Sequence, residues 1–193
     1  MSLTYLICRT HGYASKLLRR DLIRELATCR SLRELAERLS DTEYGPKLKA
    51  AGTALDFEKA LAEVFVNRLS ALSGLAPSRI KDFIESYLKK YEIQNLVWIA
   101  RMKLGGASEG EVKRLLIPIK GVSRLDVESL IKAKNLSELI NAIRESRTYQ
   151  LPEEVENIID FEAELWRSYY TQILKSFHAS PYPIGGMLRG CSA

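Results

Sequence analysis

The sequence has little glycine, proline or cysteine, and it lacks the alternation of polar and apolar residues that is typical of β-strands. Of its 193 residues, 11 are glycine, 6 are proline and 3 are cysteine. So few turn-forming residues favour long helices over many short connected strands. The one β-like run, residues 115–119, is interrupted by Pro118, which a central strand does not tolerate. We therefore predict an all-α fold.

Membrane spans and clustered metal ligands are also absent from the sequence. No run of 18 apolar residues occurs, as a transmembrane helix would require, and the N-terminus lacks the basic and then apolar pattern of a signal peptide. The cysteines, Cys8, Cys29 and Cys191, lie far apart and form no CxxC pair, whereas a zinc site needs clustered soft ligands. We expect a cytoplasmic protein with no metal, no cofactor and no direct membrane insertion.

The net charge of +5 is unevenly distributed along the chain. Residues 1–50 hold ten Lys and Arg against six Asp and Glu (+4), residues 51–120 eleven against eight (+3), and residues 121–193 eight against ten (−2). A basic N-terminal half permits binding to nucleic acid, which is the alternative function. Because acidic residues are interspersed with the basic ones, we expect a solvated helix surface and no nucleic-acid partner.

Helix-start signals recur along the chain, in which a capping side chain stands three residues before a glutamate. Three segments carry this signal: Ser31 with Glu34, Ser108 with Glu111, and Asn135 with Glu138. Together with the apolar periodicity, these signals predict helices near residues 3–18, 20–28, 31–40, 54–73, 77–103, 109–117, 124–133, 135–145 and 152–177.

Two of these predicted helices resemble each other in sequence, which indicates an internal repeat. The segment Arg30–Tyr44, RSLRELAERLSDTEY, resembles Lys134–Tyr149, KNLSELINAIRESRTY, at an offset of 104 residues. This period is too long for an ordinary solenoid, so each copy should be a small helical domain. We predict tandem domains at 1–90 and 91–180 that share long helices, followed by an irregular tail at 181–193 where a third copy would begin.

An asparagine interrupts the apolar face of the predicted helix at 77–103. The face is formed at steps of three and four residues by Ile80, Ile84, Leu88, Tyr91, Asn95, Trp98 and Met102. A buried amide costs free energy unless it is hydrogen-bonded. We therefore predict that Asn95 pairs with a neighbouring helix and fixes its register; the alternative is an asparagine at the edge of the face, in contact with water.

The region from 148 to 166 is acidic and contains no lysine or arginine between its ends. Within the predicted helix, Glu153, Asp160 and Glu164 fall on one face at spacings of seven and four. No histidine or cysteine accompanies them, and acids near a helix N-terminus are favourable for the helix dipole. We expect a solvated or partner-facing acidic helix; an enzyme that uses these acids with His178 is a further alternative.

Aromatic residues follow on the same predicted helix, at Trp166, Tyr169 and Tyr170. They could stack on bases or anchor a partner, but we predict that they belong to the core. Three apolar neighbours continue their face: Leu165, Ile173 and Phe177. No glycine pair is followed by Lys-Ser or Lys-Thr, so we expect no phosphate-binding loop and no small-molecule ligand.

The order of these motifs resembles a known family. An aromatic-led first helix (YLICRTHGYASKLL) is followed by the capped SLRELAERLSDTEYG and by two long helices, the second of which contains YEIQNL. This order is similar to that of the C subunit of archaeal A-type and bacterial V-type ATP synthases, and of the d subunit of the vacuolar ATPase. The family pattern matches Tyr91, Glu92, Asn95, Leu96 and Arg101 of this chain. The resemblance runs from about residue 5 to residue 149 and less distinctly beyond.

The resemblance implies a funnel-like architecture of three all-helical domains, of which this chain resembles the first two. It implies a non-catalytic subunit of the central stalk, peripheral on the cytoplasmic face of the membrane. Its partners would be the membrane proteolipid ring and the central-shaft subunits, which it would couple during ATP synthesis or ATP-driven ion transport. Tyr91, Asn95 and Leu96 would then have structural roles.

Overall fold

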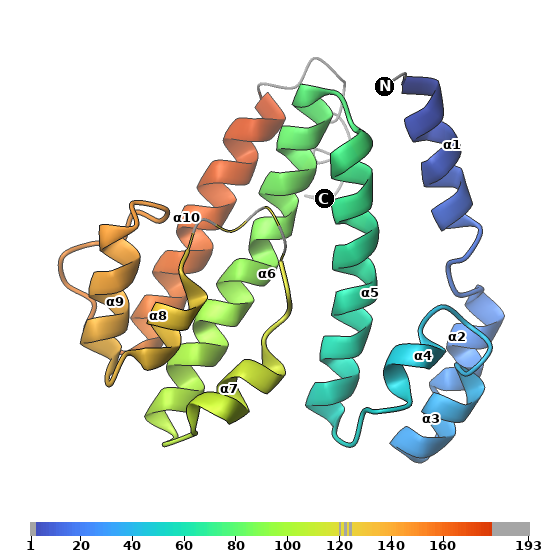
Figure 1. The fold of residues 1–193 in the computed structure, drawn as a ribbon, viewed down its shortest axis with the longest axis horizontal. Helices are drawn as coiled ribbons and strands as arrows, with labels where there is room; N and C mark the ends of the chain where they lie inside the picture. The colour runs from blue at the N-terminus through green and yellow to red at the C-terminus, as the bar shows by residue number, and fades with distance from the viewer. Residues whose placement is uncertain (1–2, 120, 122, 124, 179–193) are drawn as a thin grey trace, which may run out of the picture. The chain divides into compact units, whose positions relative to one another are not determined.

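The chain is seen in a computed structural model that describes residues 3–119, 121, 123 and 125–178. In this part of the chain every regular element is helical, which confirms the predicted all-α fold (Figure 1). The helices are α1 (Leu3–Ala14), α2 (Arg20–Leu26), α3 (Leu32–Arg38), α4 (Gly45–Leu48), α5 (Ala54–Leu75), α6 (Ser78–Leu104), α7 (Glu109–Leu115), α8 (Val127–Lys132), α9 (Leu136–Glu145) and α10 (Ile158–His178). Within the described ranges, none of them combines the length and hydropathy of a membrane span.

Two compact units make up the chain, residues 1–77 and residues 78–193. The first contains α1 to α5 and the second contains α6 to α10. The predicted repeat domains at 1–90 and 91–180 describe a sequence period and remain a prediction, and the predicted tail at 181–193 lies outside the described residues.

In the first unit, α1 and α4 pack on the long helix α5. The core of this unit contains Leu39, Leu48, Phe57 and Ala60. The short helix α4 lies in the segment around residues 42–53, where the sequence predicted no helix. Pro46 occupies the first turn of α4, where a helix tolerates proline. Gly45 is required because an added Cβ would lie 2.2 Å from the carbonyl oxygen of Ser40.

One arginine of α5 holds the loop that follows α3. Arg68 donates through Nε to Glu43 Oε2 at 3.0 Å, and its guanidinium lies 5.4 Å from the ring centre of Tyr44 and 6.0 Å from that of Tyr13. Lys16 Nζ lies 2.5 Å from Glu43 Oε1. Hydrogen bonds from Lys16 and Arg68 lower the pKa of Glu43. The loop is therefore tied to α5 by a charged and aromatic cluster.

In the second unit, α6 and α10 lie side by side and form its largest helix pair (Figure 1). Phe161 and Leu165 of α10 and Ile99 of α6 are fully buried in its core. Helices α7 and α9 also pack on α6, and α8 packs on both of them. The amphipathic periodicity of the two long helices therefore produces one continuous apolar core, which the shorter helices complete.

The capping geometry repeats at the offset found in the sequence. Ser31 and Asn135, which cap α3 and α9, each accept from the backbone N–H three residues on. In both cases that residue is a glutamate whose carboxylate accepts from the residue before the cap, Arg30 N at 3.0 Å and Lys134 N at 2.8 Å. Helices α5 and α10 also begin 104 residues apart (158 − 54 = 104). Two copies of the same local structure thus follow the sequence repeat.

Helix α10 begins later than predicted, at Ile158 rather than near residue 152. The Arg144 guanidinium donates to the carbonyl oxygens of Pro152 and Glu153, the latter at 2.7 Å, so these groups are bound outside a helix. Asn157 Oδ1 caps α10 by accepting from Ile159 N at 2.9 Å and Asp160 N at 3.0 Å. Glu153 therefore lies in the preceding loop, and the prediction that it shares a helix face with Asp160 and Glu164 is wrong.

The Asn157 cap is testable by substitution. Replacing Asn157 by Ala removes two hydrogen bonds to free backbone N–H groups and should lower the free energy of unfolding by about 1 kcal/mol, as measured by urea denaturation. Glu156→Ala is the matched control, since this adjacent exposed residue makes no capping bond, and it should change stability by less than about 0.5 kcal/mol. Equal effects of the two substitutions would contradict the assignment.

Candidate functional site

Helix α6 places two polar side chains inside the core of the second unit. Glu92 is 3% exposed and Asn95 is 6% exposed, and in the described part of the chain only one other polar residue, Ser73, is comparably buried. Because they are three residues apart, Glu92 and Asn95 lie on one side of the helix. Tyr91 and Leu96, which the resemblance also assigned structural roles, are buried beside them.

Asn95 binds the backbone of one residue in the extended segment after α7. Its Nδ2 donates to the Ile117 carbonyl oxygen at 2.8 Å, and its Oδ1 accepts from Ile117 N at 2.9 Å. The amide thereby satisfies both polar groups of a residue that is 1% exposed. The predicted partner, a neighbouring helix, is corrected to this non-helical segment.

Glu92 pairs with Tyr149, which lies in the connection between α9 and α10. The Tyr149 hydroxyl donates to Glu92 Oε2 in the interior of the unit. Burial, followed by the negative charge of Glu92, raises the pKa of Tyr149. The sequence analysis named both residues, one in the family pattern and one at the end of the repeat, but it did not predict their contact. No signal in a single sequence links positions 57 residues apart.

These α6 groups are suited to positioning chain segments. Each polar atom of Asn95 is occupied by the backbone, and the Tyr149 hydroxyl faces a carboxylate. Within the described residues, no three His, Cys, Asp or Glu side chains gather as a metal-binding group. The arrangement fixes two connecting segments on one helix.

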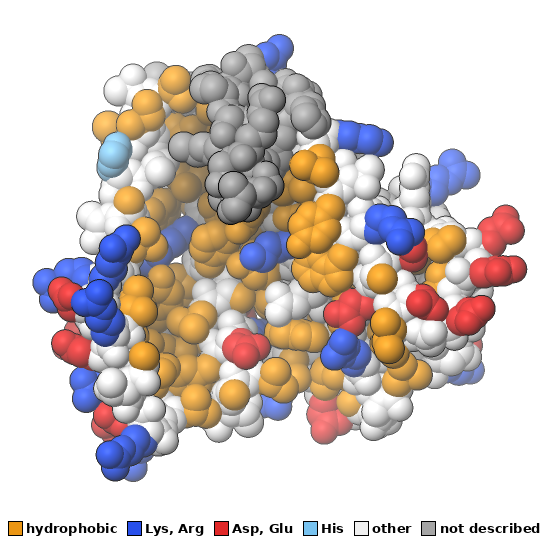
Figure 2. All heavy atoms as spheres, turned by 180° about the vertical axis from the view of Figure 1, so that it is seen from behind, with side chains coloured by type: hydrophobic (Ala, Val, Ile, Leu, Met, Phe, Trp, Pro, Cys, Tyr) orange, Lys and Arg blue, Asp and Glu red, His pale blue; other side chains and the backbone are white. Residues whose placement is uncertain are grey.

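Acidic side chains gather where the chain passes from α9 to α10 (Figure 2). We call the exposed residues Glu153, Glu154 and Glu156 the acidic edge. None of the three forms an ion pair with another described residue. Their charge is therefore not neutralised by any described residue.

The acids within α10 have partners in the same unit, an amide for Asp160 and arginines for Glu162 and Glu164. Asp160 accepts from Asn157 Nδ2 at 2.7 Å, and Glu164 lies 2.6 Å from Arg167. Glu162 lies 2.5 Å from Arg101, a residue of the matched family pattern. The sequence analysis predicted a partner-facing role for Glu153, Asp160 and Glu164. Glu153 has no ion-pair partner among the described residues, whereas Asp160 and Glu164 each already bind a neighbour.

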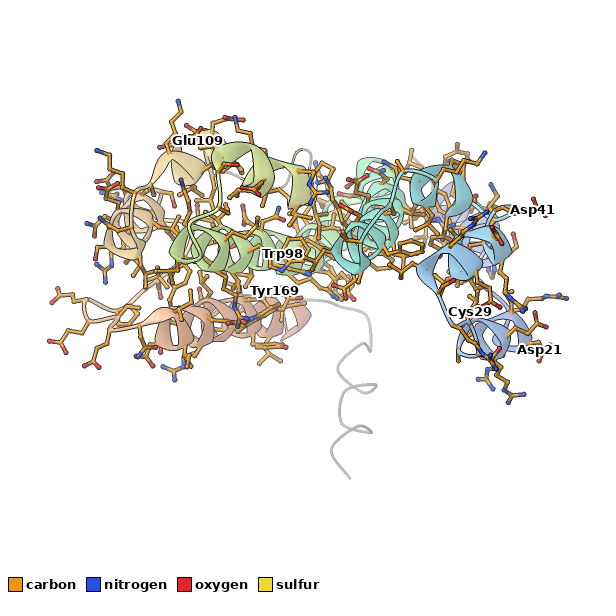
Figure 3. All side chains as sticks on the ribbon, turned by 90° about the horizontal axis from the view of Figure 1, so that it is seen from below. Asp21, Cys29, Asp41, Trp98, Glu109 and Tyr169 are labelled. Carbon is orange, nitrogen blue, oxygen red and sulfur yellow. The ribbon has the colours of Figure 1, made fainter. Side chains whose placement is uncertain are left out.

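The aromatic residues of α10 divide between core and surface. Tyr169 is 5% exposed and lies on the side of α10 that meets α6, where Trp98 is also found (Figure 3). Trp166 packs at the edge of the core, whereas Tyr170 is 57% exposed. The core prediction is therefore right for Tyr169 and wrong for Tyr170. Leu165 and Ile173 are buried as predicted, and the side chain of Phe177 lies outside those described.

A family model and individual known proteins that match this chain agree on one family. The model of the ATP synthase (C/AC39) subunit family matches residues 6–186. The C subunit of the A-type ATP synthase of Methanocaldococcus jannaschii is 26% identical over 183 residues, and the match covers 89% of this chain and 46% of that protein. Its counterpart in Pyrococcus furiosus is 25% identical over 179 residues, covering 89% and 47%. That of Desulfurococcus is 27% identical over 179 residues, covering 89% and 48%. The chain thus spans about half the length of these relatives.

The Asn95 pairing can be tested by its loss. Asn95→Leu leaves the N–H and the carbonyl of Ile117 buried and unpaired, and each such group costs about 1–3 kcal/mol. The free energy of unfolding in urea should fall by about 2 kcal/mol or more. Asn67→Leu on the exposed face of α5 is the control and should change it little. If Asn95→Leu unfolded at the same urea concentration as the parent, the pairing would contribute nothing.

Buried tyrosines predict a loss of stability at alkaline pH. Burial raises the pKa of Tyr91 and of Tyr169 to about 12, from 10.0 when exposed. Above pH 10 the unfolded chain releases these protons while the folded chain retains them, so folding is favoured below pH 10 and weakens as pH rises to 12. Each tyrosine contributes a slope of up to about 1.4 kcal/mol per pH unit. Tyr169→Phe should reduce the measured slope between pH 10 and 12, and an unchanged slope would contradict this.

Proposed function

Because the chain belongs to the ATP synthase (C/AC39) subunit family, we propose that it is a non-catalytic subunit of the central stalk of a rotary A- or V-type ATP synthase. In this role it couples the membrane proteolipid ring to the central shaft during ATP synthesis or ATP-driven ion transport. The observation that carries the proposal is the family match, which extends over residues 6–186 and therefore includes both compact units.

The construction of the second unit supports a mechanical role. Helix α6 has 27 residues and is therefore about 40 Å long. It packs along α10, and its buried polar groups bind both connecting segments. Close-packed helices deform little and transmit strain. A coupling protein needs this property, since torque must pass through it without being absorbed by rearrangement.

The acidic edge is our candidate for a partner contact. Three uncompensated carboxylates on one loop favour association with a basic surface elsewhere in the stalk. Asp160 and Glu164 lie on the adjoining helix and would contribute only by exchanging their present partners. We place the protein on the cytoplasmic face of the membrane, held there through the other proteins of the complex.

A native gel tests the proposed function. Membranes of the source organism are solubilised in mild detergent, intact complexes are separated, and the chain is detected with an antibody. We expect it to migrate with the ATPase activity, and recovery solely in fractions without ATPase activity would overturn the proposal.

The acidic edge is tested by charge reversal in the same assay. Glu154→Lys should reduce the fraction of the chain that migrates with the complex at least severalfold, and the loss should be greater at low than at high salt. Glu58→Lys, an exposed glutamate of α5, should leave that fraction unchanged. Equal retention of both variants would exclude the acidic edge as a contact while leaving the family role intact.

A further inference from the structure

We propose that the outer face of α10 binds the same face of a second copy of this chain, with the two α10 helices antiparallel. In Figure 3, α10 lies on the opposite side of α6 from α7 and forms an outer side of the second unit. This face combines exposed apolar residues with a charge pattern that is complementary to itself. The association of two free chains through α10 is independent of the central-stalk role.

Apolar side chains run along the outer face of α10. We call them the α10 stripe, and its members are Ile159, Ala163, Trp166, Tyr170 and Leu174. They follow one another at steps of three and four residues and therefore fall within an arc of about 80° around the helix. Ile159 is 73% exposed, Tyr170 57% and Leu174 48%. Among the described residues of the second unit, one other large apolar side chain, Leu104, is comparably exposed. Exposed apolar residues gathered on one face indicate a contact surface.

Tyr170 is held in place within the stripe by its aromatic neighbours. Its ring centre lies 5.2 Å from that of Tyr169 and 6.1 Å from that of Trp166. Tyr169 is buried in the core and Trp166 packs against it. A side chain that is already restrained loses little conformational entropy when a partner covers it. Tyr170 is therefore suited to anchor a protein contact.

A row of charged residues lies beside the stripe and changes sign along the helix. Its members share one side of α10 by helical spacing, and in chain order they are Asp160, Glu164, Arg167 and Lys175. Glu164 and Arg167 pair with each other. At the two ends, Asp160 binds the uncharged amide of Asn157, and Lys175 forms no ion pair with a described residue. Every Asp and Glu of the chain lies among the described residues, so the row keeps a negative start and a positive end.

An antiparallel pair of α10 helices brings these opposite charges together. In an antiparallel pair related by a two-fold axis, the same side of each helix faces its counterpart in the reverse direction. With the axis near Trp166, Asp160 of one copy approaches Lys175 of the other, and this contact occurs twice. A parallel pair would place Asp160 beside Asp160 and Lys175 beside Lys175, and like charges in contact are unfavourable.

The same register matches the apolar residues of the stripe by size. Ile159 and Leu174 are centred on the point between residues 166 and 167, and so are Ala163 and Tyr170. In the antiparallel pair, Ile159 therefore lies opposite Leu174, and the exposed ring of Tyr170 lies opposite the small side chain of Ala163. Large residues opposite small ones allow two helices to approach and interdigitate.

The mass of the whole chain in solution tests the association. The stripe spans 15 positions, about 22 Å of helix, so the interface is small and the dimer should be weak. In sedimentation equilibrium under reducing conditions we expect the mass of one chain, 21.9 kDa, at about 1 µM and a rise toward twice that mass at about 200 µM. A chain that remains monomeric at about 200 µM would overturn the proposal and leave the face to a different protein.

Two matched substitutions test whether the stripe is the interface. Leu174→Glu puts a charge into the stripe and should weaken the association at least tenfold. Leu104→Glu is the control, because Leu104 is similarly exposed but lies at the end of α6, and it should leave the association constant within twofold. Far-ultraviolet circular dichroism checks that both variants are folded. Equal effects of the two substitutions would show that α10 is not the contact.

A charge exchange tests the antiparallel direction. Asp160→Lys and Lys175→Glu should each weaken the association at least threefold, because each brings like charges together. The double variant exchanges the two charges, restores their attraction and should associate within twofold of the parent. The rescue separates a direct contact from a loss of helix stability, since a destabilising effect would accumulate in the double variant. A double variant as weak as either single variant would overturn the antiparallel pairing.

Discussion

The second unit depends on a hydrogen-bonding constraint at Ile117. The chain leaves α7 in an extended conformation at Leu116 and then buries Ile117, where no helix can satisfy its backbone. A buried N–H and carbonyl must find partners, and the side-chain amide of Asn95 offers one acceptor and one donor in the right geometry. Glutamate or leucine in place of Asn95 could not supply both. Asn95 thereby fixes Ile117 and, with it, the start of the connection from α7 to α8.

Glu92 extends the same principle to a second connection. It lies three residues before Asn95 and binds Tyr149 between α9 and α10. One helix face therefore anchors two loops from the inside. Buried polar pairs contribute little net stability compared with apolar packing, but a wrong arrangement leaves them unpaired and is strongly disfavoured. The two pairs thus add directional contacts to the apolar packing of the second unit on α6.

The features predicted correctly from the sequence are those decided by neighbouring residues. Ser108 with Glu111 forms the predicted capping box, and the caps at Ser31 and Asn135 are also present. Periodicity located Asn95 on the buried side of α6. Its partner could not be predicted, because Ile117 is 22 residues away and contributes only its backbone, which carries no sequence signal. The start of α10 was misplaced for a similar reason, since the Arg144 guanidinium holds the carbonyls of residues 152 and 153 from a distance in sequence.

The two copies of the repeat have the same helix caps but different tertiary contacts. Tyr44 and Tyr149 end the two copies of the repeated motif, and each ties the segment after a capped helix to a long helix. In the first unit the Tyr44 hydroxyl accepts from Arg68 of α5 at 3.5 Å, beside the half-exposed Glu43. In the second the Tyr149 hydroxyl donates to the buried Glu92 of α6. The caps are the same in both copies because they need only residues within one turn. The tyrosine partners differ in charge and in burial, Arg68 in the first copy and the buried Glu92 in the second, because they come from long helices that are distant in sequence and differ between the two units.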